Sequence, residues 1–66
     1  MQMIECFSNV QGCKEAQQVL AELNELKSRD SIFDLYHNGE DSYTIGGSVT
    51  REDWDRLDLQ SDFMEI

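Results

Sequence analysis

The chain of 66 residues contains no proline, few basic residues and no apolar run long enough to cross a membrane. Its first seven residues carry no basic leader, and Glu5 interrupts their apolar character, so we expect no signal peptide and a cytoplasmic protein. Five Lys and Arg residues against fourteen acids provide no basic stripe to meet phosphates. Direct binding to nucleic acid and to anionic membranes is therefore disfavoured.

Residues that carry catalytic chemistry are also scarce. The single histidine, His37, adjoins Asn38-Gly39, where a solvated turn residue is expected. Cys6 and Cys13 lack the Cys-x-x-Cys spacing of redox and zinc motifs, and in the cytoplasm we expect both to be reduced. Nothing in the sequence brings Cys6 to His37 as a nucleophile and base. These observations predict a protein that is not an enzyme and needs no cofactor.

Two patterns only superficially resemble ligand sites. Asp53-x-Asp55-x-x-Asp58 lacks the glycine and the terminal glutamate of a calcium-binding loop, and it begins inside a predicted helix. Gly46-Gly47 is not followed by Lys-Ser/Thr, as a phosphate-binding loop requires. We therefore predict no metal site and no phosphate loop.

The most informative feature present is an uneven negative charge. Residues 30–66 hold ten acids against two bases, Arg51 and Arg56, whereas residues 1–29 hold four acids against three bases. The formal charges of the two parts are −8 and −1, which together give the net charge of −9. A concentrated negative field attracts basic surfaces.

The short length predicts one domain, residues 1–66, with a marginal core that dimerisation could stabilise. Six aromatic residues spread along the chain argue for a folded protein. Composition and periodicity predict a strand at 2–7, a loop at 8–12, a helix at 13–28, strands at 31–37 and 42–46, and a helix at 49–58. Residues 59–66 fit a strand, a helix or a loop. The order indicates an α+β, β-α-β-β-α domain whose antiparallel sheet is covered by the long first helix, with the short second helix near the C-terminus.

Asn38-Gly39 predicts a hairpin between the two central strands. We expect a three-residue loop at 38–40 with a glycine bulge, because this loop pairs Leu35 with Tyr43 and Phe33 with Ile45 and so gathers apolar side chains on one face. Ile32, Asp34 and Tyr36 would then lie on the opposite face. Gly46-Gly47 is interpreted as a connection after the second strand of the hairpin.

The second helix has a clear start signal. Thr50 is the expected N-cap and Asp53 completes an approximate capping box, while Val49 and Trp54 suit a hydrophobic staple. If this helix runs on to residue 62, Glu52, Asp55, Asp58 and Asp62 form a row with neighbours about 5–6 Å apart. Such a row could imitate phosphates, with Glu40, Asp41, Asp30 and Asp34 as a second row. The alternative is that these acids are simply solvated, with Arg51–Asp55 and Glu52–Arg56 pairs supporting the helix.

A chain this small and acidic, without a catalytic motif, resembles the phage-encoded inhibitors of bacterial defence, the anti-CRISPR and anti-restriction proteins. The resemblance is one of size and composition over the whole chain, and these residues carry it: Glu40, Asp41, Glu52, Asp53, Asp55, Asp58, Asp62 and Glu65. It implies a DNA mimic in the host bacterial cytoplasm that binds the Lys/Arg-rich nucleic-acid-binding groove of a Cas effector subunit or restriction enzyme.

The surface predicted to bind this partner consists of Asp34, Glu40, Asp41, Glu52, Asp55, Asp58 and Asp62, with Tyr36 as an aromatic anchor. Tyr43, Trp54 or Phe63 would add anchoring area if they are exposed. We expect the protein to be a monomer or a homodimer. The rival hypothesis is a small acidic interaction subunit or antitoxin-like partner without nucleic-acid mimicry. It would dock through an apolar surface around Ile32 and Tyr36, and its binding would survive high salt.

Overall fold

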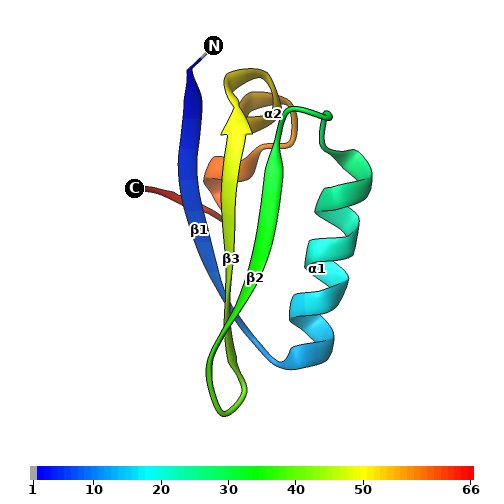
Figure 1. The fold of residues 1–66 in the computed structure, drawn as a ribbon, viewed down its shortest axis with the longest axis vertical. Helices are drawn as coiled ribbons and strands as arrows, with labels where there is room; N and C mark the ends of the chain where they lie inside the picture. Colours follow the sequence, from blue (N-terminus) through cyan, green and yellow to red (C-terminus); the bar gives the residue numbers. More distant parts are fainter. Residues whose placement is uncertain (1) are drawn as a thin grey trace.

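The computed structural model describes residues 2–66 and confirms the α+β architecture, with a sheet of four antiparallel strands in the order β2-β3-β1-β4 (Figure 1). In chain order the elements are β1 (Met3–Gln11), α1 (Cys13–Leu26), β2 (Ile32–Gly39), β3 (Ser42–Thr50), α2 (Arg51–Arg56), the 3-10 helix η1 (Leu59–Ser61) and β4 (Met64–Glu65). Within residues 2–66 no helix combines the length and apolar character needed to cross a membrane.

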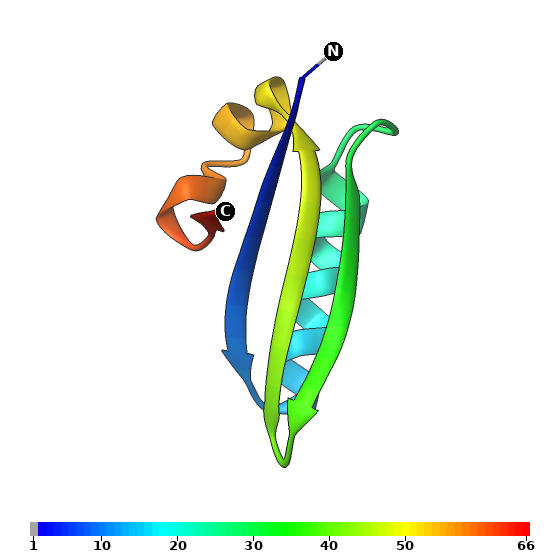
Figure 2. The ribbon, with the colours of Figure 1, turned by 60° about the vertical axis from the view of Figure 1, so that its left-hand side comes forward.

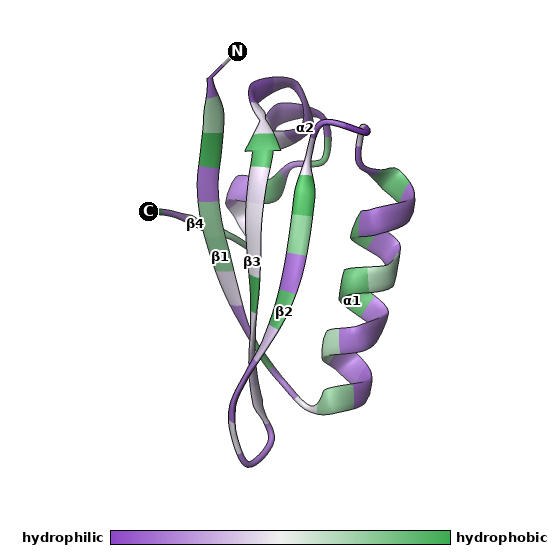
Figure 3. Ribbon diagram, viewed as in Figure 1, coloured by the Kyte–Doolittle hydropathy of each residue, from purple (hydrophilic) through white to green (hydrophobic). Residues whose placement is uncertain are grey.

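Both helical parts of the chain pack on the same face of the sheet. The register places Ile4, Val49 and Ile45 on that face, and their buried side chains form one cluster with Trp54, Leu59 and Phe63 from the C-terminal segment. From α1, the half-buried Val19, Leu20 and Leu23 pack against the same cluster. Figure 1 shows the C-terminal segment behind the strands and Figure 2 shows α1 behind them, while within residues 2–66 no helix covers the other face. Apolar and polar residues occupy different sides of α1, as one-sided burial requires (Figure 3).

Two strands are longer than the sequence pattern indicated. The loop predicted at 8–12 is wrong, because β1 pairs with β3 along its full length, up to Gln11 opposite Ser42. Likewise β3 continues through Gly46-Gly47 to Thr50, so the predicted break at these glycines is wrong. Conversely, α1 ends at Leu26, two residues before the predicted end.

The two glycines belong in the strand because aromatic rings cover them. A Cβ atom added to Gly46 would lie 3.0 Å from Cε2 of Tyr36, and one added to Gly47 would lie 3.0 Å from Cε1 of Phe33 and 3.1 Å from Sγ of Cys6. Neighbouring residues of a strand face opposite sides of the sheet. Gly47 therefore accommodates the core, and Gly46 accommodates Tyr36 on the face without helices.

The hairpin has a different register from the one predicted. Its turn is Glu40-Asp41, and Leu35 pairs with Ile45 instead of Tyr43, so the predicted three-residue loop is wrong. A bulge between His37 and Gly39 does occur, and Phe33, Leu35, Tyr43 and Ile45 do share one face. Gly39 has a φ of 115°, which suits glycine.

Side-chain contacts favour this longer hairpin. The His37 ring stacks on Tyr43 with centroids 4.6 Å apart, and its Nε2 bonds the Glu40 carbonyl oxygen at 2.7 Å. Asn38 Nδ2 donates to Thr44 Oγ1 at 2.6 Å. His37 is thus paired in the ladder, Asn38 is the residue in the bulge, and the turn forms at Glu40-Asp41.

The predicted start of α2 is confirmed: Thr50 is the N-cap, and its Oγ1 accepts a hydrogen bond from Asp53 N at 3.1 Å. Val49 and Trp54, the residues of the predicted staple, are both buried. The helix ends at Arg56, two residues before the predicted end. The undecided tail forms η1 and the short edge strand β4.

Asp53 is the buried centre of the connection between α1 and α2. Its Oδ2 accepts hydrogen bonds from Ser28 N at 2.9 Å, Ser28 Oγ at 2.8 Å and Ser31 Oγ at 2.6 Å, and its Oδ1 accepts one from Arg56 Nη2 at 2.7 Å. The capping box is therefore only half formed, since Thr50 N donates to Ser31 Oγ at 3.1 Å instead of to Asp53. Burial opposes ionisation of the carboxyl, but these hydrogen bonds outweigh it and hold the Asp53 pKa well below its ordinary value.

Candidate functional site: the open face of the sheet

The face of the sheet without helices, called the open face below, collects side chains from four separate segments. Register and strand alternation place these residues on it: Glu5, Phe7, Ile32, Asp34, Tyr36, Thr44, Gly46, Ser48, Met64 and Ile66. The last two belong to the C-terminal edge, where Met64 pairs with Phe7 and Ile66 N donates to the Glu5 carbonyl oxygen at 2.9 Å. No single stretch of sequence makes this surface.

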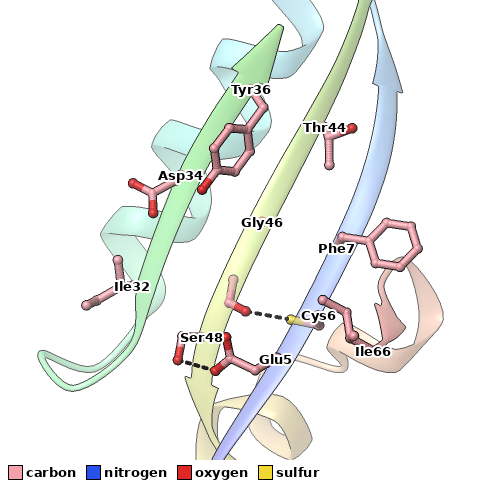
Figure 4. A pocket seen from close by; sticks show the side chains of 11 residues that line it. Glu5, Cys6, Phe7, Ile32, Asp34, Tyr36, Thr44, Gly46, Ser48 and Ile66 are labelled. Carbon is pink, nitrogen blue, oxygen red and sulfur yellow. Dashed lines mark hydrogen bonds between the residues drawn. The ribbon is translucent and has the colours of Figure 1, made fainter. Parts of the chain in front are cut away.

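A shallow groove of about 390 Å³ runs across the open face (Figure 4). Its floor is the β3 backbone at Gly46-Gly47, which carries no side chains. Ile32 and Tyr36 line it from β2, and Glu5 and Phe7 line it from β1. Gly46 places no side chain on this face, so the larger side chains of β1 and β2 flank a depression over β3.

The open face exposes most of the large hydrophobic side chains that the protein leaves in water. Within residues 2–66, five such side chains are exposed, and four of them lie here: Ile32 (58%), Tyr36 (55%), Met64 (65%) and Ile66 (84%). Isolated exposed apolar residues are ordinary, but a cluster of them marks a contact surface. The open face is therefore a candidate contact surface.

The charge of the open face is negative. None of the four strands in the described chain contains Lys or Arg, whereas Glu5 and Asp34 both lie on this face and are exposed. Glu5 Oε2 accepts a hydrogen bond from Ser48 Oγ at 2.6 Å, which holds the Glu5 side chain toward β3. Asp34 has no ion-pair partner within residues 2–66. An apolar groove with unneutralised carboxylates is complementary to a surface bearing Lys or Arg.

The side chains near the groove do not form a nucleophile and base. Cys6 is a free, buried thiol whose pKa is raised to about 11 by burial and by the charges of Glu5 and Glu65, so it stays protonated at neutral pH. Cys6 lies opposite Gly47 and His37 lies opposite Tyr43. Those positions are four residues apart on β3, about 13 Å at the usual rise per residue.

The structure separates the predicted partner-binding residues into three places. Asp34 and Tyr36 lie on the open face. Glu40 and Asp41 form the exposed hairpin turn, where the Asp41 carbonyl oxygen accepts a hydrogen bond from Gly12 N at 2.7 Å. The other four, Glu52, Asp55, Asp58 and Asp62, are exposed on the C-terminal segment.

The predicted helical row of Glu52, Asp55, Asp58 and Asp62 does not form. After α2 ends, Asp58 adopts a left-handed conformation with φ of 52°, and its Oδ2 accepts a hydrogen bond from Ser61 Oγ at 2.8 Å. The last two acids of the row thus lie beyond a change of chain direction. Regular phosphate-like spacing along one helix is therefore excluded.

The two predicted ion pairs of α2 have different outcomes. Arg51 does pair with Asp55, at 3.4 Å between Nε and Oδ2. The expected pair of Glu52 with Arg56 is wrong, because Arg56 Nη2 donates instead to Asp53 and to the Leu26 carbonyl oxygen, at 2.8 Å for the latter. Of the cluster from Asp53 to Asp58, Asp53 is buried among serines, and no group of three metal-binding side chains gathers within residues 2–66.

Sequence reasoning did not find Glu5, Phe7 or the glycine floor. A signal was available: the alternation from Ser42 to Thr50 continues through Gly46-Gly47, and glycine in a strand often marks close approach by another group. Comparison with known proteins found no matching family model, no matching curated protein and no matching solved structure.

Proposed function

We propose that this protein is a non-enzymatic inhibitor that binds, through the open face, a Lys/Arg-rich nucleic-acid-binding surface of another protein and keeps DNA away from it. A Cas effector subunit or a restriction enzyme of a bacterial defence system is the partner that fits the resemblance to phage-encoded inhibitors. The observation that supports the proposal best is the open face itself, which combines exposed apolar side chains with carboxylates and contains no base.

The remaining carboxylates extend the negative field around this face. Thirteen of the fourteen acids are exposed, and within residues 2–66 only Asp55 among these thirteen has an ion pair. Such a field speeds association with a basic surface and suppresses binding to acidic partners. The field steers the encounter, and the apolar groove supplies the contact area.

Tyr36 and Asp34 suit an arginine of the partner. The Tyr36 ring lies close to Gly46, and Asp34 lies on the same face of the sheet at the outer edge of β2 (Figure 4). A guanidinium group can stack on an aromatic ring and pair with a carboxylate through two N–H groups, which the ammonium of lysine does less well. We therefore place the anchor of the interface at these two residues.

The experiment is a competition assay with purified DNA-targeting Cas effector complexes and restriction enzymes bound to labelled target DNA. The proposal expects the protein to displace DNA from one of them, with an affinity that falls steeply between 50 and 200 mM salt. Asp34→Lys with Tyr36→Ala should abolish displacement, whereas Glu25→Lys on α1, away from the open face, should not. Displacement that is unchanged by the open-face variant would contradict the proposal.

The second candidate function is an acidic interaction subunit or antitoxin-like partner that does not mimic nucleic acid. The four exposed hydrophobic side chains of the open face favour it, because an apolar interface resists salt. Partner binding that persists at high salt and leaves DNA binding intact would select this function.

A further inference from the structure

A second groove lies on the helix-covered side of the sheet, between α1 and the C-terminal segment. It measures about 620 Å³, and we call it the helix groove. Val10 of β1 contributes to its floor, Val19 and Leu23 of α1 form one wall, and Leu57 and Phe63 belong to the other. At one end of the groove α1 and α2 are joined, where Arg56 Nη2 donates to the Leu26 carbonyl oxygen.

The apolar side chains of the helix groove are incompletely covered. Val10, Val19, Leu23 and Leu57 are only half-buried, and Leu26 at the end of α1 is 49% exposed. On α1 the lining positions are 15, 19, 22, 23 and 26, which recur at three- and four-residue steps and so form one side of the helix. This side is about 16 Å long, or three helical turns.

The charged residues of the helix groove are all acidic. Glu15 and Glu22 of α1 lie on one side and Asp62 lies on the other, and no Lys or Arg lines the groove. A second copy of this acidic chain would bring like charges together there. The complementary occupant has an apolar stripe flanked by positive charges.

We propose that the helix groove binds an amphipathic helix of a partner protein, about three turns long, with an apolar stripe and Lys or Arg on its flanks. Grooves of this kind read apolar side chains at three- and four-residue steps along the bound helix. The site is independent of the proposed function, because it lies on the opposite side of the sheet from the open face.

The test uses a fluorescent fourteen-residue peptide of leucine and lysine, with leucines at three- and four-residue steps, and the full chain at about 150 mM salt, where distant charges are screened. A peptide of the same composition with strictly alternating order, which suits a strand, is the control. We expect saturable binding of the helical peptide and at least tenfold weaker binding of the control. Equal affinity for both peptides, or no binding of the helical peptide at 1 mM protein, would overturn the proposal.

Matched variants locate the site. Leu26→Gln in the helix groove should weaken binding about fivefold, because a half-exposed leucine loses its contact. Ile32→Gln, at a position of similar exposure on the open face, should change the affinity less than twofold. Glu22→Lys should weaken binding by about three- to tenfold, and Glu25→Lys, on α1 outside the groove, by less than twofold. If Glu22→Lys and Glu25→Lys weakened binding equally, the proposal would also be overturned. Equal losses would show that the peptide is attracted by the overall negative charge and not bound in the groove.

Discussion

The two faces of the sheet are built from the same strands but differ in how far their side chains are buried. On the helix-covered face, Ile45 and Val49 are fully buried, whereas on the open face Ile32 and Tyr36 are more than half exposed. Strand alternation assigns neighbouring residues to opposite faces. One face therefore provides most of the core, and the other is free for the proposed binding. Substitutions on the two faces should separate stability from binding.

The largest expected loss of stability comes from Asp53, which supports the helix-covered side. Asp53→Ala removes the acceptor of four hydrogen bonds and should lower the free energy of unfolding by about 3 kcal/mol or more. Asp55→Ala, which breaks only an exposed ion pair, should cost at most about 1 kcal/mol. Urea unfolding measures both, and similar losses would contradict the assigned role of Asp53.

Acid should reduce the stabilisation that the ionised Asp53 carboxylate provides. Because the Asp53 pKa is lower in the folded chain than its ordinary value of 3.8, the unfolded chain takes up the proton more readily. The stabilisation is present above about pH 4 and is lost as the pH falls toward the folded value. Urea unfolding at pH 5 and pH 3 should show this loss in the wild type.

The control for the pH experiment is Asp53→Asn. Its stability should fall less between pH 5 and pH 3, because this carboxyl no longer titrates. The other acids affect both proteins alike, so the difference between the two slopes isolates Asp53. Parallel slopes would show that Asp53 is not the group responsible.

The adjacent glycines of β3 face opposite sides of the sheet, so an alanine substitution at each one tests a different face. Gly47→Ala presses a methyl group against Phe33 and Cys6 in the core and should cost about 1–3 kcal/mol. Gly46→Ala meets only the exposed Tyr36 ring, which can move, and should cost less than about 1 kcal/mol. However, it should displace that ring and weaken partner binding. Urea unfolding and a binding titration on both variants test whether Gly47→Ala mainly lowers stability and Gly46→Ala mainly lowers binding. A larger stability loss for Gly46→Ala would contradict this prediction.

The smallest stability effect is expected on the open face itself. Ile32→Ser and Tyr36→Ser remove exposed side chains and should change the free energy of unfolding by about 0.5 kcal/mol or less, while reducing partner binding. Thermal unfolding monitored by circular dichroism provides the check. A loss in the free energy of unfolding well above about 0.5 kcal/mol would show that the open face stabilises the fold.

Much of the fold could be predicted from the sequence because local patterns determine it. The apolar stripe of α1 and the cap at Thr50 are short-range signals, and both identified the correct element. The hairpin register could not be predicted in the same way. Alternation determines which side chains share a face, but a register shift of two residues leaves the same side chains on each face. The Asn38-Gly39 signal was therefore overridden by the stack of His37 on Tyr43 and the bond from Asn38 to Thr44.

The candidate site was predicted only in part for a related reason. Asp34 and Tyr36 follow from alternation in one strand, but Glu5 and Phe7 join them through pairing of β1 with β3, which local sequence does not reveal. The acidic row failed because Trp54 and Leu59 must both reach the core, and residues five apart do not share one face of a helix. The chain turns at Asp58 to place them there, and the helix cannot continue.

The central claim is that the open face, rather than the acidic surface in general, receives basic groups. Titration of the isotope-labelled protein with nona-arginine, followed through backbone amide shifts, tests it most directly. We predict the largest shifts at Asp34, Tyr36 and Gly46, weaker binding of nona-lysine, and loss of the arginine preference in Tyr36→Leu. Shifts spread evenly over the acids of α1, α2 and the hairpin turn, with equal affinity for both peptides, would contradict it.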